Sequence, residues 1–432
     1  MMKRMLFALA ALVACQFALA GVKIEHWVSP SGARVYFVES RALPILDVQV
    51  DFAAGSMFDP AGKPGVASLT RGILDLGAGN LDENAIADRL ADIGAQLGGG
   101  ADNDRASVAL RTLSTPEKRE QALDLLRLVL SSPRFDGAIF LREKTRTIAN
   151  LKESLTRPDV IASKAFWEAM YPVHPYGREA MPETVAKIGR DDLTRFYRTY
   201  YNARNATVTL VGDVSRAEAE KIAESLLAKL PPGEAPALPP PPQLPKEGIQ
   251  RIAHPAAQSH IHIGLPAIAK GDPDFFPLVV GNYTLGGGGF VSRLMKEVRD
   301  KRGYAYNVYS YFAPLKQPGP FQIGLQTKRS QADEALQVTR AILQDFLKDG
   351  PSPEELAAAK ANLVGSFPLR LDSNRKILEN VANIGFYGLP LDYLDRYQDR
   401  IRAVTADEVR QAFARHIRPE NLVTVMVATD KP

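Results

Sequence analysis

The sequence predicts an α+β fold made of two duplicated domains, each an antiparallel sheet backed by helices. A chain of 432 residues exceeds the roughly 250–300 residues at which one hydrophobic core stops growing, so two or more domains are expected. Stretches with apolar residues at three- and four-residue spacing alternate with stretches of period two, as helices and strands do. The two flanks of one proline-rich stretch follow the same plan, which indicates a duplication.

The segments along the chain give the predicted domain boundaries. Residues 1–20 carry two basic residues before an apolar run and a small-residue cleavage site, which is typical of a secretory signal peptide. Residues 21–230 are the predicted N-terminal domain. Residues 231–248, PPGEAPALPPPPQLPKEG, are expected to form an extended linker, because proline favours a semi-rigid spacer. Residues 249–432 are the predicted C-terminal domain, and export makes the periplasm the expected location.

Composition excludes several classes of partner. Without Lys3 and Arg4, 51 of the 53 Lys and Arg residues remain against 49 Asp and Glu, so the mature chain is nearly neutral and no nucleic-acid partner is indicated. No internal apolar run is long enough for a membrane span. The single cysteine, Cys15, lies in LVAC inside the signal, which is either a lipoprotein motif that would attach a lipid anchor or a cysteine without a role. In both cases the mature chain has no disulfide.

The two halves repeat the same succession of elements. Each begins with alternating strand residues, continues through an Asp-Pro turn into an apolar helix, and ends with a helix followed by a β-rich run. The strands at 106–113 and 319–328 fit sheets with one covered face. Predicted strands also lie at 33–39, 46–55, 205–213, 259–267 and 421–429, and predicted helices at 62–72, 83–97, 118–132, 217–230, 275–285 and 332–347.

The stretch AAGSMFDPAGKPGVASLTRG, residues 53–72, resembles the start of the catalytic domain of the insulinase/pitrilysin zinc peptidases, and most of all their processing-peptidase branch. In active members this segment continues into His-x-x-Glu-His. The resemblance extends through YNARNATVTLVGDV into the second half and covers nearly the whole mature chain. It implies a peptidase-like domain in each half, with the zinc motif in the first.

This chain departs from the family at every zinc-motif position. The resemblance assigns the two histidine ligands to Ser68 and Gly72, the general base to Arg71, and the third ligand to Asn150. Only the acidic neighbour, Glu143, remains. Catalytic zinc needs three protein ligands and an open position for water, and these residues cannot supply them. The chain is therefore expected to bind no metal and to be a degenerate, non-catalytic member of the family.

Other metal or nucleophile sites find little support in the sequence. His260 and His262 share one face of a strand with His254 upstream, so a site is conceivable, but strand histidines that pack or form hydrogen bonds are the competing interpretation. No neighbouring carboxylate or cysteine completes a ligand set. No Ser-His-Asp or Cys-His arrangement is indicated, because GxSxG is absent and the only cysteine lies in the signal.

The stretch YTLGGGGFVSRLMKEVRDKRGYAY, residues 283–306, carries the second set of candidates. Its glycines open a predicted helix but lack the Gly-Lys-Ser/Thr of a phosphate loop. The resemblance implies a glycine-rich loop that handles peptide substrate. Arg299, which follows a predicted helix, and Tyr306 look like the Arg…Tyr pair that helps to hold substrate and the tetrahedral intermediate. The alternative is a helix-capping arginine and a strand aromatic. The loop glycines are Gly286, Gly287, Gly288 and Gly289.

Two functional hypotheses follow from the resemblance. In the first, the chain is inactive alone and is the non-catalytic subunit of a two-chain periplasmic zinc metallopeptidase. It would then bind peptide and donate Arg299 and Tyr306 in trans to a homologue that carries the zinc. In the second, it is a peptide-binding or scaffolding protein with no role in proteolysis.

Overall fold

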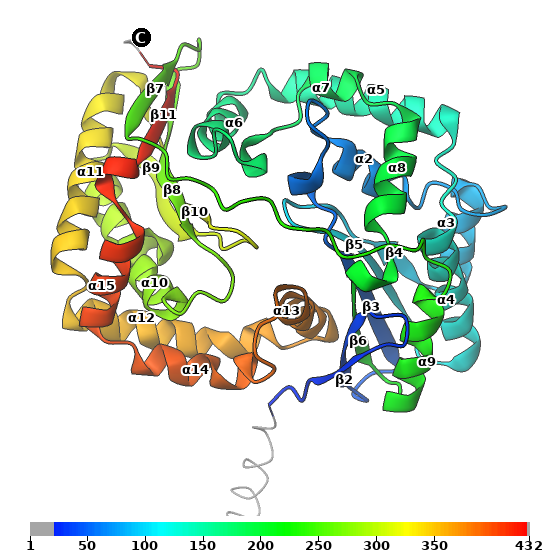
Figure 1. Ribbon diagram of the computed structural model, residues 1–432. Coiled ribbons are helices and arrows are strands. Elements are labelled where there is room, and N and C mark those ends of the chain that lie inside the picture. The colour runs from blue at the N-terminus through cyan, green and yellow to red at the C-terminus, as the bar shows by residue number, and fades with distance from the viewer. Residues whose placement is uncertain (1–20, 430–432) are drawn as a thin grey trace, which may run out of the picture.

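Two β-sheets, one in each half of the chain, organise the structure. The computed structural model describes residues 21–429, so the predicted signal peptide and Cys15 lie outside the described residues. Figure 1 shows the sheets on opposite sides of the molecule, with helices packed around each. The predicted α+β fold of two duplicated domains is confirmed.

The sheet of the N-terminal half has six strands in the order β1-β2-β6-β3-β5-β4. Alternate residues such as Val35 and Phe37 face one core with the helices of this half, while Tyr36 and Val38 face the opposite side. The elements of this half are β1 (Glu25–Val28), β2 (Arg34–Glu39), β3 (Ile45–Phe52), α2 (Val66–Ile73), α3 (Glu83–Asp92), β4 (Gln96–Gly98), β5 (Ala106–Leu113), α4 (Pro116–Ser131), α5 (Gly137–Ser154), α6 (Pro158–Met170), α7 (Pro182–Ala186), α8 (Arg190–Tyr200), β6 (Ala206–Gly212) and α9 (Arg216–Leu227).

The sheet of the C-terminal half has five strands in the order β7-β11-β8-β10-β9. One face packs on α10, α11 and α15, where Leu278, Leu343 and Phe413 belong to the same core as the strand residues. The elements of this half are β7 (Gly248–Ile252), β8 (Gln258–Ile268), α10 (Phe275–Asn282), β9 (Ala305–Phe312), β10 (Gly319–Lys328), α11 (Ala332–Asp349), α12 (Pro353–Ser366), α13 (Asn374–Tyr387), α14 (Tyr393–Ala403), α15 (Ala406–His416) and β11 (Val423–Val427).

The strand order shows the duplication directly. The run β2-β6-β3-β5-β4 of the first sheet corresponds to β7-β11-β8-β10-β9 of the second. Each sheet departs from the predicted antiparallel pattern at one equivalent place, because β2 pairs in parallel with β6, and β7 pairs in parallel with β11. The last strand of each half returns through several helices before it enters the sheet, and such a long connection permits parallel pairing.

Each half also supplies a helix that covers the other half's sheet. Helix α6 packs on β8 and β11, where Phe166 contacts a row of valines that includes Val425. Helix α13 packs on β6, β3 and β2, where Val381 contacts Tyr36 and Val211. In Figure 1 both helices lie between the two sheets. The core therefore continues across the two halves.

Two expectations for individual elements are wrong. For the strand at 319–328 the expectation of one covered face is wrong, because most residues of β10 are buried on both sides. The strand at 106–113 keeps the predicted alternation, since buried and half-buried residues alternate along β5. The helix predicted at 83–97 ends at Asp92. Gly94 adopts a φ of 66°, which breaks the helix, and the residues that follow form the edge strand β4.

The proline-rich stretch 231–247 contains no helix or strand and runs between the two halves in Figure 1. Strand β7 begins directly after it, at Gly248. The domain boundaries drawn from the sequence stay a prediction. Within the described residues, none of the helices has the length and apolarity that a bilayer crossing requires.

Candidate functional site

A buried carboxylate fixes the start of helix α2. Asp59 Oδ2 accepts a hydrogen bond of 2.7 Å from Gly65 N, and Asp59 Oδ1 accepts one of 2.7 Å from Ala67 N. Backbone N–H groups at a helix start have no partner within the helix, so these bonds stabilise α2. Burial raises the pKa of Asp59 to about 6, and the two backbone hydrogen bonds oppose the rise. The Asp-Pro turn thereby sets the direction of α2.

Three of the four zinc-motif positions are exposed and lie on neighbouring helices. Ser68 and Gly72 are exposed on α2. Asn150 is exposed on α5, and α5 packs against α2. The helices that carry these positions thus lie where the resemblance implies a metal site. Their side chains offer a hydroxyl, no group at all, and an amide.

Arg71, at the fourth position, points into the protein and is only 4% exposed. Its Nε donates to Ser107 O at 2.5 Å and its Nη2 donates to Gly98 O at 2.5 Å. Gly98 ends the edge strand β4, and Ser107 lies in β5. The guanidinium therefore links the last two strands of the sheet by charge-assisted hydrogen bonds. The position of the family's general base has become a structural contact.

The residues around α2 and α5 do not fit a zinc ion. Three imidazole or carboxylate ligands are required, and none stands at the assigned positions. Glu143 on α5 is buried, and its carboxylate pairs with Arg142 at 2.9 Å and with Arg146. Arg71 adds a buried cation, which would repel a divalent ion.

Among residues 21–429, one group has the spacing of metal ligands, and it lies elsewhere. It consists of Asp272 and Asp274, just before α10, and His416, the last residue of α15. Arg415 already binds both oxygens of Asp274, at 2.7 and 2.8 Å, and His416 Nε2 lies 2.9 Å from Asp274 Oδ2. This arrangement is an ion-pair network that ties α15 to α10.

The strand histidines pack as structural residues. His262 Nδ1 lies 2.8 Å from the side-chain amide of Gln322, and its ring lies 5.4 Å from that of Phe166. Burial lowers the pKa of His262 to about 4 and also lowers the pKa of His260. In the described part of the chain no third metal-ligating atom completes a site with them.

The glycine-rich loop has structural reasons for its composition. A Cβ at Gly286 would lie 2.5 Å from the backbone N and the Oγ of Ser310, so only glycine fits against β9. Gly289 adopts a left-handed φ of 60°, with open space around it. The loop consists of a π-helical turn, Tyr283–Gly287, followed by a 3-10 turn, Gly289–Val291. It does not open a regular α-helix as the sequence suggested.

Arg299 lies between two exposed aromatic rings. It belongs to a second π-helical segment, Met295–Asp300, so it lies within that helix and not after it. Its Cζ is 4.7 Å from the ring centre of Phe290 and 5.2 Å from that of Tyr306. Both distances are within the range of cation–π attraction. π-Helical segments are rare and are frequent at functional sites.

A β-bulge turns Tyr306 outward. Along β10, Gln326 pairs with Asn307 and Thr327 pairs with Ala305, which leaves Tyr306 without a partner in the ladder. Its side chain is 83% exposed. Bulges often redirect a side chain next to an active site. We call the half-buried Arg299 and the exposed Phe290, Val291 and Tyr306 the Arg299 patch.

Comparison with known proteins identifies the family. Residues 35–183 match the family model described as Insulinase (Peptidase family M16), and residues 187–363 match Peptidase M16 inactive domain. A Pseudomonas fluorescens crystal structure described as a peptidase M16 inactive domain is 37% identical. It covers 95% of this chain and 100% of its own, with a TM-score of 0.91. The chain belongs to peptidase family M16.

Curated relatives of this M16 chain carry differing descriptions. A Helicobacter pylori protein named non-peptidase homolog YmxG is 26% identical over 98% of this chain and 99% of its own length. A Bacillus subtilis protein named uncharacterized zinc protease YmxG is 25% identical over 94% of this chain and 98% of its own length. The absence of the M16 zinc ligands from this chain agrees with the first description.

Sequence reasoning missed part of the candidate site. Phe290 and Val291 had a local signal, because two large apolar residues directly follow four glycines. The inward direction of Arg71 had none, since its acceptors lie on strands far along the chain. The structure places the Arg299 patch in the C-terminal half and the former zinc motif in the N-terminal half.

Proposed function

We propose that this chain is the non-catalytic subunit of a two-chain M16 peptidase and donates Arg299 and Tyr306 to the zinc site of an active homologue. The proposal rests on the loss of the zinc ligands together with the presence of the Arg–Tyr pair. The positions of the zinc ligands cannot bind metal. The half-buried Arg299 contacts the exposed ring of Tyr306, and both residues lie on irregular backbone. Residues 1–20 have the pattern of a secretory signal, which favours the periplasm as the location of the two chains.

The chemistry of the patch supports a role toward peptide. A tyrosine hydroxyl can donate a hydrogen bond to the oxygen of a carbonyl that becomes tetrahedral, and Tyr306 is exposed enough to reach a ligand. Arg299 can orient a peptide carbonyl or carboxylate by its fork of donors. Phe290 and Val291, which are 66% and 54% exposed, offer an apolar surface to a substrate side chain. The exposed loop glycines allow a backbone to approach closely.

The second candidate is a peptide-binding or scaffolding protein without a role in proteolysis. The name of the Helicobacter pylori relative, non-peptidase homolog, favours it. Both candidates use the Arg299 patch, and they differ in whether its side chains act on a reacting carbonyl. A change that keeps the ring of Tyr306 and removes its hydroxyl separates them.

The experiment uses the mature chain alone and mixed with the His-x-x-Glu-His homologue from the same genome. Alone, the chain is expected to contain no stoichiometric zinc by elemental analysis and to cleave no unfolded peptide. In the mixture, Tyr306→Phe is expected to lower kcat about 10²- to 10³-fold, as does removal of one oxyanion donor. Arg299→Ala is expected to have a comparable effect. Arg198→Ala, an exposed arginine on α8, is the matched control.

Each outcome has one interpretation. Loss of cleavage with Tyr306→Phe, and normal cleavage with Arg198→Ala, supports the subunit. Cleavage by the homologue that is independent of this chain, together with peptide binding that depends on Phe290, supports the scaffold. One tightly held zinc in the isolated chain contradicts both.

A further inference from the structure

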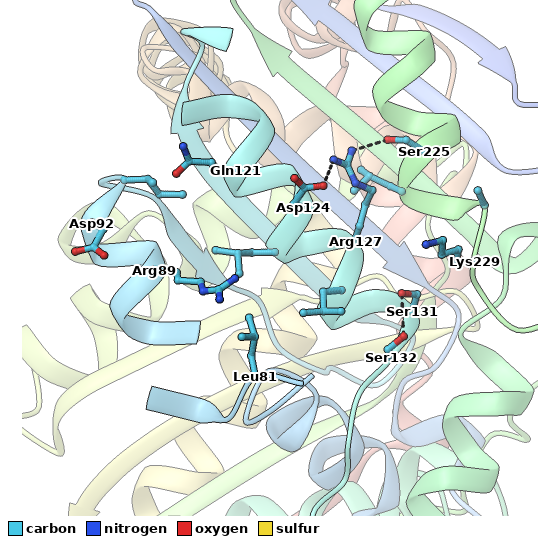
Figure 2. A pocket seen from close by; sticks show the side chains of 15 residues that line it. Leu81, Arg89, Asp92, Gln121, Asp124, Arg127, Ser131, Ser132, Ser225 and Lys229 are labelled. Atoms are coloured by element: carbon cyan, nitrogen blue, oxygen red, sulfur yellow. Dashed lines mark hydrogen bonds and ion pairs between the residues drawn. The ribbon is translucent and has the colours of Figure 1, made fainter. Parts of the chain in front are cut away.

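A groove lies on the outer surface of the N-terminal half, between helices α3, α4 and α9. Its volume is about 870 Å³. The floor is apolar, with Leu125 and Leu128 from α4 and Leu226 from α9. Arg89 from α3 and Lys229, just after α9, stand on opposite sides of this floor, as Figure 2 shows. We call it the α3–α4–α9 groove.

Two basic side chains that line the groove can bind an anion. Arg127 is already engaged, because it forms an ion pair with Asp124 and donates to Ser225 Oγ at 3.0 Å. Arg89 and Lys229 form no ion pair or hydrogen bond within residues 21–429. In Figure 2 Asp92 lies at the far edge, and the guanidinium of Arg89 extends toward the middle. An anionic group in the groove would therefore meet uncompensated positive charge.

Polar groups at one end add hydrogen-bonding capacity. The hydroxyls of Ser131 and Ser132 lie 3.3 Å from each other at the end of α4, and Figure 2 shows them beside Lys229. Hydroxyls and an ammonium group together suit a carboxylate or phosphate oxygen.

The size of the groove favours a small molecule. Fifteen residues line it, fewer than the roughly 20–30 residues that each partner contributes to a standard protein interface. Its volume lies within the range of about 300–1,000 Å³ that is usual for small-molecule sites. A partner protein would have to bury much more surface than the groove provides.

We propose that the α3–α4–α9 groove binds a small anionic amphiphile. Its apolar body lies on Leu125 and Leu128, and its carboxylate or phosphate is attracted by both Lys229 and Arg89. This site is separate from the Arg299 patch, which belongs to the C-terminal half, so it stands independently of the proposed function.

The test measures binding of decanoate, decyl phosphate and neutral decanol to the mature chain by titration calorimetry. The two anionic probes distinguish a carboxylate ligand from a phosphate ligand. We expect saturable 1:1 binding of at least one anion and weaker binding of decanol. Arg89→Gln and Lys229→Gln are each expected to weaken binding about three- to fivefold, as for exposed ion pairs. Lys221→Gln, an exposed lysine of α9 outside the groove, is the matched control.

Leu128→Glu tests the apolar floor, since it places a carboxylate where the ligand body lies. It is expected to abolish binding of both anions, and circular dichroism checks that the variant is folded. If it fails to fold, the proposal is tested by the variants at Arg89 and Lys229 alone, because both residues are exposed. The proposal is overturned if neither anion binds saturably. It is also overturned if decanol binds equally well, or if Lys221→Gln weakens binding as much as Arg89→Gln does.

Discussion

The phenolic hydroxyl of Tyr387 donates a hydrogen bond of 2.8 Å to Asp104 Oδ2, and this contact joins the C-terminal half to the N-terminal half. Asp104 is fully buried. It also accepts hydrogen bonds from Lys316 N at 2.9 Å and from the hydroxyl of Tyr176. Burial raises the pKa of Asp104, while the tyrosine and backbone donors oppose the rise. One carboxylate thus connects two loops and two helical segments across the interface.

Asp104→Asn is expected to lower the free energy of unfolding by about 2–3 kcal/mol, because it removes charge-assisted hydrogen bonds and places an amide N–H against other donors. Tyr387→Phe removes one hydrogen-bond donor only and is expected to lower the free energy of unfolding by about 1 kcal/mol. Urea unfolding followed by circular dichroism measures both. Equal midpoints for the native chain and Asp104→Asn would show that the interface does not depend on this carboxylate.

Asp51 gives a prediction about pH. It is fully buried on β3, and burial raises its pKa to about 6, although Arg105 Nη1 lies 3.7 Å away. The folded state therefore holds a proton that the unfolded state releases near pH 4. This group's contribution to stability is complete below about pH 4 and is lost as the pH rises toward about 6.

Asp51→Asn is neutral at every pH, so its stability relative to the native chain is expected to rise between about pH 4 and pH 6. Loss of the partner of Arg105 shifts the whole curve but not its slope in this range. Urea midpoints at several pH values measure the difference, with the exposed Asp88→Asn as control. A difference that does not change with pH would contradict the raised pKa.

Arg71→Glu, which restores the family's residue type, is expected to destabilise the chain by at least about 3 kcal/mol. The new carboxylate would face the carbonyl oxygens of Gly98 and Ser107 without a donor. Ser68→Glu places a carboxylate on the exposed face of α2 and is expected to change stability by less than about 0.5 kcal/mol. Thermal unfolding compares the two, and hydrogen exchange at β4 reports the local effect. Similar melting temperatures would refute the structural role of Arg71.

Two loop glycines are expected to respond differently to alanine. At Gly286 the added methyl group collides with backbone and side-chain atoms of Ser310, and the expected cost is about 1–3 kcal/mol. At Gly289 the space is open and only the left-handed φ is unfavourable, which costs about 1–2 kcal/mol. Gly289→Asn should recover part of that loss, because asparagine tolerates this conformation. Melting temperatures test the order, and an equal response of Gly289→Ala and Gly289→Asn would refute the backbone explanation.

Local patterns predicted most elements because local rules determine them. The aromatic rows around Phe166 and Tyr197 have the helical spacing that predicts packing in a core, and both residues are buried in α6 and α8. The Asp-Pro turn predicted the start of α2, where Asp59 binds the free N–H groups. The family resemblance assigned the zinc-motif positions to residues that lie on α2 and α5, and this assignment stays a prediction.

Features that depend on distant partners could not be predicted in this way. The bulge at Tyr306 is defined by its register with β10, which no local pattern encodes. The inward direction of Arg71 depends on free carbonyl groups of β4 and β5. Covering of each sheet by α6 and α13 requires both halves to be folded together.

Because α6 and α13 each cover the sheet of the other half, the chain cannot be divided into two halves without exposing both sheets. Separation at the proline-rich stretch would strip β8 and β11 of α6, and β6 of α13, leaving Val425 and Val211 facing solvent. Neither fragment would be a self-sufficient folding unit, although the sequence between them reads as a simple tether. The two pieces would have to be produced in the same cell and assemble there, and their recovery as one complex would report how strongly these crossed helices hold the molecule together.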